Sequence, residues 1–344
     1  MKRTGKPLLD TLNGTVPDRP PVWFMRQAGR YLPEYRALRS QAGSFMDLCL
    51  DPVRAAEVTL QPIRRYAMDG AILFSDILIV PHGLGIAVAF RQGEGPVLTP
   101  TGPDDPLPEF AAGRFSARIA PILETVRRVK AALPPAVTLI GFAGAPWTVA
   151  TYMVEGGSSR DFARTKDWAF RAPERFDRLI DRLVDATIHY LRAQADAGAE
   201  ALQIFDSWAG ALPPDAFERW STAPTARIVT AIRDSHPDVP VIGFPRGAGA
   251  SIPSYASGSG VDAVGLDTAV PLEWARSAMP DVCLQGNLDP RWLVAGGSGL
   301  DAQVRRIRSA MAGHPFVFNL GHGIVPETPP EHVARAVAVL RGEA

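Results

Sequence analysis

The sequence predicts an α/β protein, a single (β/α)8 TIM barrel with elaborated loops that spans residues 1–344. Two observations predict it: eight short segments rich in Val, Ile, Leu and Phe recur along the chain, and helical patterns lie between them. The segments are nearly all apolar instead of alternating, as parallel strands covered on both faces require. They are Pro21–Met25, Ala71–Phe74, Thr138–Phe142, Ala201–Phe205, Val239–Phe244, Ala263–Leu266, Val282–Gln285 and Phe316–Leu320.

The helical patterns have recognisable ends. Asp51 followed by Pro52 predicts a cap and first turn, and Gly70 is expected to close that helix. The clearest helix runs from Pro173, with apolar residues at every third or fourth position, to a stop at Gly198. Further apolar stripes predict helices around residues 119–129, 304–311 and 333–340.

Two stretches exceed what a plain barrel needs. Arg26–Ser44 follows the first segment, and Arg91–Gly113, which is crowded with Pro and Gly, comes after the second. Both are expected to be elaborated connections. A doubly wound sheet divided into two domains is the alternative, but no change in composition marks a linker, so one domain is favoured.

Length and charge exclude several classes of protein. The chain has 344 residues, of which 46% are hydrophobic, and its 36 basic and 36 acidic residues give a formal net charge of +0. The apolar fraction excludes wholesale disorder. The lack of a basic excess argues against a nucleic-acid binder that depends on phosphate contacts.

A cytoplasmic protein with no membrane span is expected. Residues 1–19 lack the apolar stretch of a secretory signal, and polar residues and glycines interrupt the most apolar region, residues 71–90. Cys49 and Cys283 lack a C-x-x-C companion, which fits a reducing compartment. The histidines show no ligand spacing with cysteine, and the glycine pattern of Gly258–Ala263 precedes a strand instead of following one, so neither a metal nor a dinucleotide site is predicted.

Polar residues follow nearly every predicted strand. In a barrel of this type, reactive side chains lie at the carboxyl ends of the strands and in the loops that follow. These residues are therefore expected to share one rim. In chain order they are Arg26, Gln27 and Arg30, Asp76, Tyr152, Asp206 and Ser207, Arg246, Asp267, Asn287 and Asp289, and His322.

The loop after the first segment is rich in arginine. Arg26, Arg30, Arg36 and Arg39 lie within fourteen residues. Guanidinium groups bind carboxylates or phosphates through planar, bidentate contacts and keep their charge on burial, so the loop indicates a polyanionic ligand. The alternative is a solvated loop whose arginines pair with Glu34 and Asp47.

Asp76 is a carboxylate delivered from a buried strand. It could accept hydrogen bonds from ligand N–H groups or stabilise a cation formed in a transition state. The alternative is a structural carboxylate that pairs with Arg26 or caps the next turn. Tyr152, Ser207 and His322 are hydrogen-bonding or proton-transfer candidates whose value depends on sharing the rim with Asp76.

Longer stretches of the chain resemble the uroporphyrinogen decarboxylase family. Two long signatures, Trp23–Arg36 and Gly141–Gly156, carry most of the resemblance. Four shorter words match in the same order, and together the six span nearly the whole chain, which makes the match specific. The shorter words are Phe74–Ile77, Phe205–Gly210, Gln285–Pro290 and Asn319–Ile324.

The resemblance implies a cofactor-free (β/α)8 barrel, usually a homodimer, that removes the carboxyl groups of the four acetate arms of uroporphyrinogen III to give coproporphyrinogen III. By resemblance, Asp76 binds the pyrrole N–H groups and, with Arg26 and Tyr152, takes part in catalysis. The residues that the resemblance assigns to substrate binding are Arg26, Gln27, Ala28, Gly29, Arg30, Arg39, Asp76, Phe142, Tyr152, Phe205, Ser207 and His322.

The chemistry explains why the family needs no cofactor. A pyrrole that is protonated beside the acetate arm accepts the electrons left by carbon dioxide, and Asp76 would stabilise that cation in a dry pocket. Arg26, Tyr152 or a bound water are alternatives for the acid that protonates the ring; an arginine resists deprotonation, which counts against Arg26 unless the proton is relayed.

The sequence departs from the family in small ways and leaves two rival functions open. Thr268 stands where the family often has Trp, and Arg160 and Arg246 stand where it commonly has Lys. The rivals are a corrinoid- or zinc-dependent methyltransferase, which needs grouped thiolate and His ligands, and a non-catalytic tetrapyrrole carrier. Apolar segments around Trp168 and Trp220 are either a subunit contact or core.

Overall fold

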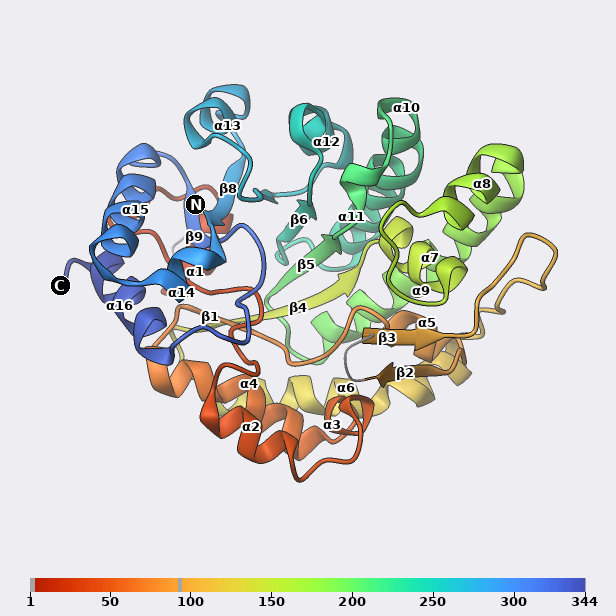
Figure 1. Cartoon of the computed structure of the whole chain (residues 1–344), viewed down its shortest axis with the longest axis horizontal. Helices are drawn as coiled ribbons and strands as arrows, with labels where there is room; N and C mark the ends of the chain where they lie inside the picture. Colours follow the sequence, from red (N-terminus) through yellow and green to blue (C-terminus); the bar gives the residue numbers. More distant parts are fainter. Residues whose placement is uncertain (1–3, 92–94, 344) are drawn as a thin grey trace.

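The centre of the protein is a curled parallel sheet (Figure 1). The computed structural model describes residues 4–91 and 95–343. Within these residues the sheet has seven strands in the order β1-β4-β5-β6-β7-β8-β9, and every neighbouring pair is parallel. The strands are β1 (Gly70–Ile72), β4 (Thr138–Gly144), β5 (Ala201–Asp206), β6 (Val241–Pro245), β7 (Ala263–Gly265), β8 (Cys283–Leu288) and β9 (Phe316–Leu320).

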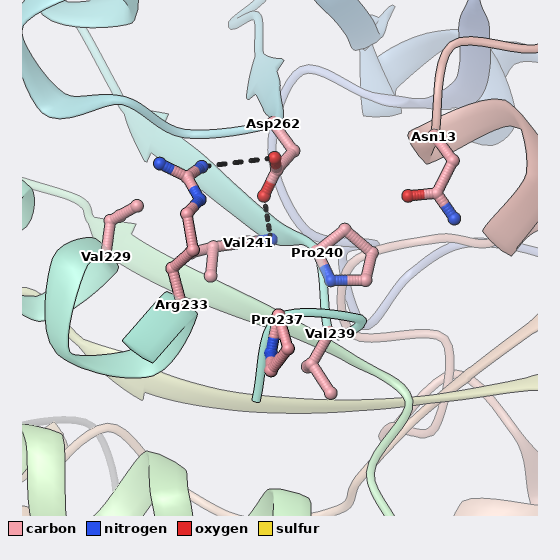
Figure 2. Close-up of a pocket in the computed structure, with 8 residues that line it drawn as sticks. All are labelled: Asn13, Val229, Arg233, Pro237, Val239, Pro240, Val241 and Asp262. Carbon is pink, nitrogen blue, oxygen red and sulfur yellow. Dashed lines mark hydrogen bonds and ion pairs between the residues drawn. The ribbon is translucent and has the colours of Figure 1, made fainter. Parts of the chain in front are cut away.

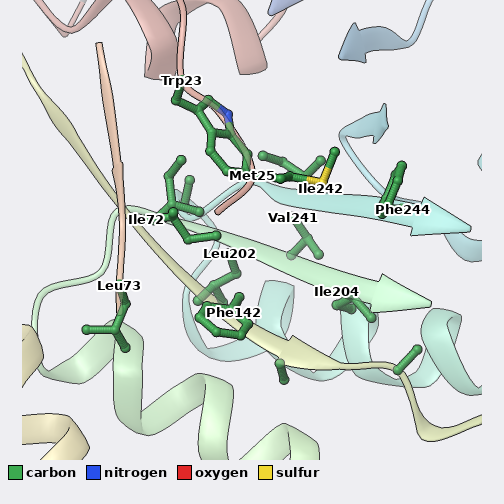
Figure 3. Close-up of a cluster of buried hydrophobic side chains, with 14 of the residues drawn as sticks. Trp23, Met25, Ile72, Leu73, Phe142, Leu202, Ile204, Val241, Ile242 and Phe244 are labelled. Carbon is green, nitrogen blue, oxygen red and sulfur yellow. The ribbon is translucent and has the colours of Figure 1, made fainter. Parts of the chain in front are cut away.

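Seven of the eight predicted strand segments are confirmed, with ends shifted by up to three residues. All seven residues of β4 are buried, as are all six of β8. Continuous burial is the physical reason for their unbroken apolar sequence, because helices cover the outside of the sheet and side chains fill its inside. Figure 3 shows part of this core. The labelled side chains are Trp23, Met25, Ile72, Leu73, Phe142, Leu202, Ile204, Val241, Ile242 and Phe244.

The first predicted strand, Pro21–Met25, is wrong as a strand. It makes only an isolated parallel bridge between Val22 and Phe318 of β9. The Phe318 N–H donates to the Pro21 carbonyl at 2.9 Å, and on the other side the Asp69 N–H donates to the Val22 carbonyl at 2.8 Å. On the β1 side the Val22 N–H donates to the Asp69 side chain instead of to a carbonyl, so Val22 makes only one backbone–backbone bond there.

Carboxylates tie neighbouring strands together at their amino ends. Asp69, Glu200 and Asp262 each stand directly before a strand, and each side chain accepts a backbone N–H from the segment alongside: the bridging segment at Val22, the amino end of β4 and the amino end of β6. The donors are Val22 at 2.9 Å, Leu139 at 3.1 Å and Val241 at 2.8 Å.

The Asp262 contact lies beside a small pocket of about 30 Å³ at the amino end of β6 (Figure 2). There Asp262 also bonds Arg233 at 3.3 Å. This pocket is at the opposite end of the strands from the predicted rim. It is therefore part of the structural base of the sheet and not of the site.

Helices surround the sheet, and the predicted ones are confirmed. The main helices are α4 (Pro52–Tyr66), α6 (Ala112–Ala132), α9 (Pro173–Asp196), α11 (Ala223–Ser235), α15 (Gly297–Ala310) and α16 (Pro330–Arg341). Shorter ones are α1 (Pro7–Leu12), α2 (Pro33–Arg39), α3 (Phe45–Cys49), α5 (Ile79–Gly83), α7 (Pro146–Glu155), α8 (Ala163–Arg171), α10 (Pro214–Phe217), α12 (Ile252–Ser259), α13 (Leu272–Ala278) and α14 (Pro290–Ala295).

The start of α4 agrees with the sequence, but its end does not. The Asp51 carboxylate accepts the N–H groups of Val53 and Arg54, both at 3.0 Å. The helix closes at Ala67, which adopts a left-handed conformation with φ of 50°. Gly70, predicted to end the helix, instead begins β1, where a Cβ atom would lie 2.7 Å from the Leu8 side chain.

The two elaborated connections contain regular structure. Arg26–Ser44 includes α2, and it leads directly into α3. After β1 the chain forms α5 and an antiparallel hairpin of β2 (Val88–Arg91) and β3 (Gly95–Leu98), so the predicted connection at Arg91–Gly113 begins inside a hairpin. Residues 92–94 of that connection lie outside the described residues.

Trp168 and Trp220 belong to the core. Only 2% of Trp168 and 3% of Trp220 is exposed. Both rings pack edge-on against Phe176 of α9, with centroids 5.7 and 5.3 Å away. In the part of the chain that the structure describes, no helix has the length and apolar character needed to cross a bilayer.

The Asp69 contact is expected to hold the Pro21–Met25 segment to β1. Replacing Asp69 by Ala leaves the Val22 N–H without its acceptor, and the free energy of unfolding in urea should fall by about 1–3 kcal/mol. Asp18→Ala, at an exposed carboxylate close in sequence, should change it by less than about 0.5 kcal/mol. Equal stabilities of the two variants would contradict the assignment.

Candidate active site

The carboxyl ends of the strands bring the predicted rim residues to one side of the sheet. Asp76 follows β1, Tyr152 lies on α7 after β4, and Ser207 follows β5. Arg246 follows β6 and His322 follows β9. Electrostatic effects link these groups: Arg26 acts on Asp76, Tyr152 and His322 at once. The residues from distant parts of the sequence therefore share one electrostatic environment.

Asp76 is a partly buried carboxylate with one free oxygen. Its Oδ1 accepts the Leu78 N–H at 2.9 Å, so the predicted capping of the next turn is present. Its Oδ2 has no hydrogen-bond partner among the described residues. Burial raises the pKa of Asp76 to about 6, although the Leu78 N–H and the Arg26 guanidinium oppose the rise. The carboxyl group is therefore mostly ionised at pH 7 and has an oxygen available to a ligand.

Arg26 projects from a strained turn. Its φ is 59°, in the left-handed region that few non-glycine residues adopt. Its side chain passes over Gly323: a Cβ atom at that position would lie 2.4 Å from the Arg26 Cδ. The Ile324 N–H also donates to the Met25 carbonyl at 2.9 Å, which joins this loop to the one that carries His322.

The loop arginines have different environments. Arg36 donates from Nη1 to the Arg30 and Tyr31 carbonyls, at 2.9 and 3.1 Å, so it holds the loop together. Arg39 donates to the carbonyls of Ala42 and Gly43 at 3.2 and 3.4 Å. Arg26 and Arg30 are exposed and make no hydrogen bond through their side chains to the described residues.

The alternative pairing with Glu34 and Asp47 is wrong. Glu34 bonds Arg65 of α4 at 2.7 and 2.9 Å, and Asp47 caps α3 by accepting the Ser44 N–H at 2.7 Å. None of the four loop arginines makes an ion pair with a described residue. The rim therefore carries positive charge that the described part of the protein leaves unpaired.

Gln27, Ala28 and Gly29 play different parts in this loop. The Gln27 side chain is fully buried; its Oε1 accepts the Phe24 N–H at 3.0 Å and its Nε2 donates to the Gly70 carbonyl at 3.1 Å. It anchors the turn and its amide is not available to a ligand. The N–H groups of Ala28 and Gly29 have no acceptor within the described residues, so this backbone can receive an anion.

Aromatic side chains gather at the carboxyl ends of β4 and β5 and in the segments that follow them. The rings of Phe142 and Phe205 meet edge to face, with centroids 5.5 Å apart. The ring centroid of Tyr152 lies 6.1 Å from that of Trp208. Burial raises the pKa of Tyr152, so its hydroxyl keeps its proton at neutral pH. The half-buried Ser207 hydroxyl makes no hydrogen bond to a described residue, which leaves it free for a ligand.

His322 is a neutral imidazole within the electrostatic reach of two guanidinium groups. Burial, helped by Arg246 and Arg26 and opposed by Asp267, lowers its pKa to about 4. The Asp267 carboxylate is engaged with backbone: it accepts the Gly247 N–H at 2.7 Å and the Ala269 N–H at 2.8 Å. His322 can therefore hydrogen-bond an anion without adding charge.

Three residues predicted for the rim are structural. Asp206 is fully buried and accepts the hydroxyls of Thr148 and Ser221, each at 2.6 Å. Asn287 donates to the carbonyls of Asp267 and Val270, each at 2.8 Å, and Asp289 caps α14 by accepting the Arg291 N–H at 2.8 Å. The sequence alone does not separate these from site residues, because polar groups that hold the strand ends follow the strands at the same positions.

Sequence reasoning missed Trp208 as a wall residue. Its ring contacts Tyr152, Phe162 and Arg246. Its position directly after Ser207 was the available signal. In the described part of the chain, no group of three or more His, Cys, Asp or Glu side chains is arranged to hold a metal ion.

Comparison with known proteins identifies the family. The family model described as uroporphyrinogen decarboxylase matches residues 3–342. The chain belongs to this family. Proteins named uroporphyrinogen decarboxylase from Rhodospirillum rubrum and Granulibacter bethesdensis are 54% and 56% identical to it. The match to the first relative covers 98% of each chain, and the match to the second covers 98% of this chain and 99% of the relative.

A solved structure shows the same fold at low sequence identity. A methyltransferase from Methanosarcina mazei superposes with a TM-score of 0.81 at 19% identity, over 99% of each chain. At this identity the likeness concerns the fold alone. The high-identity relatives favour the decarboxylase family over the methyltransferase alternative.

The environment of His322 predicts an unusual titration. Because its pKa is lowered to about 4, the imidazole should stay neutral through pH 5 and gain a proton only near pH 4. NMR of the ring carbons, with the signal assigned by its loss in His322→Gln, measures this value. His236, which is hydrogen-bonded to an exposed Asp196, serves as the internal comparison. A His322 midpoint above pH 6 would contradict the described environment.

Proposed function

We propose that this protein removes the carboxyl groups of the four acetate arms of uroporphyrinogen III, giving coproporphyrinogen III and carbon dioxide in tetrapyrrole biosynthesis. Asp76 carries the proposal: this half-buried carboxylate has an oxygen without a partner among the described residues, and it lies within the electrostatic reach of Arg26, one of four loop arginines that make no ion pair in the described chain. A porphyrinogen has pyrrole N–H groups at its centre and eight carboxylates at its edge. This pairing of a central acceptor with a positive rim matches that distribution.

Substrate binding divides between these groups. Asp76 Oδ2 accepts pyrrole N–H groups, and Arg26, Arg30 and Arg39 bind the side-chain carboxylates. The free N–H groups of Ala28 and Gly29 supplement the arginines. Gln27 supports the turn without contacting the substrate, because its amide is already satisfied.

The remaining residues complete the pocket. Phe142 and Phe205 pack against the apolar parts of the macrocycle, which excludes water from the reacting arm. Ser207, Tyr152 and the neutral His322 offer hydrogen bonds to carboxylates or to the ring edge.

The reaction needs no cofactor because the substrate holds the electron sink. A proton adds to the pyrrole carbon beside the acetate arm and makes the ring cationic. The bond to the carboxyl carbon then breaks, carbon dioxide leaves, and the electron pair flows into the ring. Protonation of the resulting exocyclic methylene gives the methyl group. Asp76 stabilises the cationic ring by its negative charge.

The environments of Tyr152 and Arg26 bear on the proton donor. Burial raises the pKa of Tyr152, so the hydroxyl is a weak acid here. An arginine side chain resists deprotonation, so Arg26 serves as a donor only through a relay. A water bound by Arg26 beside the ring is the third alternative.

We also propose one closed eight-membered barrel over residues 1–344, with Pro21–Met25 as the eighth member, in a cytoplasmic homodimer. Hydrogen bonds of this segment to both β9 and the residue before β1 support closure. The homodimer and its location rest on the family resemblance, and light scattering after size exclusion tests the former.

Carbon dioxide release tests the function directly. Anaerobic incubation of the protein with uroporphyrinogen III should release four equivalents of carbon dioxide per macrocycle and yield coproporphyrinogen. Binding of the macrocycle without gas release would favour the carrier and overturn the proposed activity.

Asp76→Asn should keep the shape of the pocket and lose the charge that stabilises the cation. We expect kcat to fall by at least about 100-fold. Asp104→Asn, at an exposed position, is the matched control and should keep full activity. Full activity of Asp76→Asn, with an unchanged thermal unfolding midpoint, would remove Asp76 from the mechanism.

The raised pKa of Asp76 predicts an acid limb in the pH profile. Because the pKa is about 6, the group is ionised above pH 6 and protonated below it, so kcat/KM should fall as the pH drops through 6. Substrate carboxylates titrate about two pH units lower. The residual activity of Asp76→Asn should lack the limb near pH 6, and its persistence in that variant would assign it to another group.

A further inference from the structure

We propose that Arg246, held over the ring of Trp208, forms a carboxylate-binding position across the pocket from the arginine-rich first loop. The inference rests on the proposed function and adds a specificity residue to it. Its ligand is a carboxylate on a side arm of the porphyrinogen. The family resemblance gave Arg246 no role, and Trp208 none beyond its place in a matched word.

The order of the strands places Arg246 opposite Arg26. β6 is the middle strand of the sheet, three strands from each end. The segment that carries Arg26 instead bonds both β9 and the residue before β1, which are the two ends of the sheet. In a curled sheet these positions face each other. A macrocycle with carboxylates around its whole edge needs cations on both sides.

Trp208 fixes the direction of the Arg246 side chain. The Arg246 Cζ lies 6.0 Å from the centre of the Trp208 ring, within the range of a cation–π contact. The Trp208 ring is itself packed against Phe162 and Tyr152, with centroids 5.2 and 6.1 Å away. The guanidinium therefore rests on a rigid aromatic surface, while its N–H edge stays free for a ligand.

One buried residue holds both partners of this pair. The backbone N–H of Arg246 donates to the Asp206 carbonyl at 3.0 Å. The Trp208 N–H donates to Thr148 Oγ1 at 3.1 Å, and that hydroxyl donates to the Asp206 carboxylate at 2.6 Å. The Trp147 indole N–H also donates to the Trp208 carbonyl at 3.0 Å. These hydrogen bonds fix the backbone of Arg246 and of Trp208 relative to each other.

The described residues leave the charge of Arg246 uncompensated. Arg246 makes no ion pair with any of them, and both oxygens of the neighbouring Asp267 accept backbone N–H groups. His322 lies within the field of both Arg246 and Arg26 and is held neutral there. Two guanidinium groups beside one neutral imidazole form a place for an anion.

Arginine and lysine are not equivalent at this position. A planar guanidinium stacks on an indole and presents two parallel N–H groups to a carboxylate, whereas an ammonium group is a point charge that does neither as well. Since the family commonly has Lys here, this chain should bind the arm at this position more tightly than a variant that restores Lys.

Direct binding and steady-state kinetics test the inference. The variants are Arg246→Gln, Arg246→Lys and, as the matched control, Arg171→Gln, which removes an exposed arginine on α8. Arg246→Gln should raise both KM and the Kd for uroporphyrinogen by about tenfold or more, with kcat changed less than about threefold. Arg246→Lys should fall between wild type and Arg246→Gln, and Arg171→Gln should match wild type.

A double-variant cycle checks the role of Trp208. Trp208→Leu should weaken binding by itself, and it should reduce the further loss caused by Arg246→Gln, because both act on one carboxylate contact. Thermal unfolding midpoints close to that of wild type exclude general misfolding.

The outcomes separate this inference from the proposed activity. A wild-type protein that binds uroporphyrinogen but releases no carbon dioxide overturns the activity. In that case the ratio of the Kd of Arg246→Gln to that of wild type still tests the role of Arg246. An Arg246→Gln variant that folds and binds with unchanged Kd overturns the carboxylate position, even if the wild type is fully active. A loss confined to kcat would also overturn it.

Discussion

The site depends on one constraint: the half-buried carboxylate of Asp76 is held within reach of the Arg26 guanidinium, which makes no ion pair with a described residue. Asp76 would lower its energy by moving to water or by pairing fully with Arg26, and the structure provides neither. Its backbone bond to Leu78 fixes one oxygen, and the strained Arg26 turn holds the guanidinium where it acts on several groups at once. The pocket is thus organised in advance of its ligand, at a cost in stability.

Contacts at the opposite end of the strands offset this loss of stability. Glu200 and Asp262 bond the amino ends of β4 and β6, and Asp69 bonds Val22 of the bridging segment, so these contacts fix the register of neighbouring segments. Glu200 also pairs with Lys6 and Lys130, and Asp262 with Arg233. Because a strand is short and stiff, fixing one end sets where the other end presents its side chain. The amino ends therefore stabilise the sheet, and the carboxyl ends are free to carry strained polar groups.

The sequence was sufficient for the parts of the fold that obey burial and helix periodicity. Continuous apolar runs predicted seven strands, and α4 and α9 began where Asp51 and Pro173 indicated. The segment at Pro21–Met25 has the same composition as a strand, but its pairing depends on a side chain 47 residues away, which no local pattern reveals. Gly70 was misread for a related reason: it is small because Leu8 and Trp23 crowd it, not because it ends a helix.

The site was predictable as a set of positions more than as a set of roles. Because the carboxyl ends of parallel strands lie at one edge of a sheet, the sequence placed Asp76, Tyr152, Ser207 and His322 correctly on one side. It also collected Asp206 and Asn287, whose side chains turn back into the protein to bond hydroxyls and carbonyls. Direction of a side chain at a strand end depends on tertiary partners, so residue type and position cannot supply it.

At Arg26 a strained left-handed backbone conformation lowers stability, while the side chain supplies positive charge to the rim. Glycine would adopt a φ of 59° without the steric penalty that the Cβ atom of arginine incurs, and the fold would be more stable. The same change would erase the charge that reaches Asp76 and His322. Stability and the charge at this rim therefore place opposite demands on residue 26.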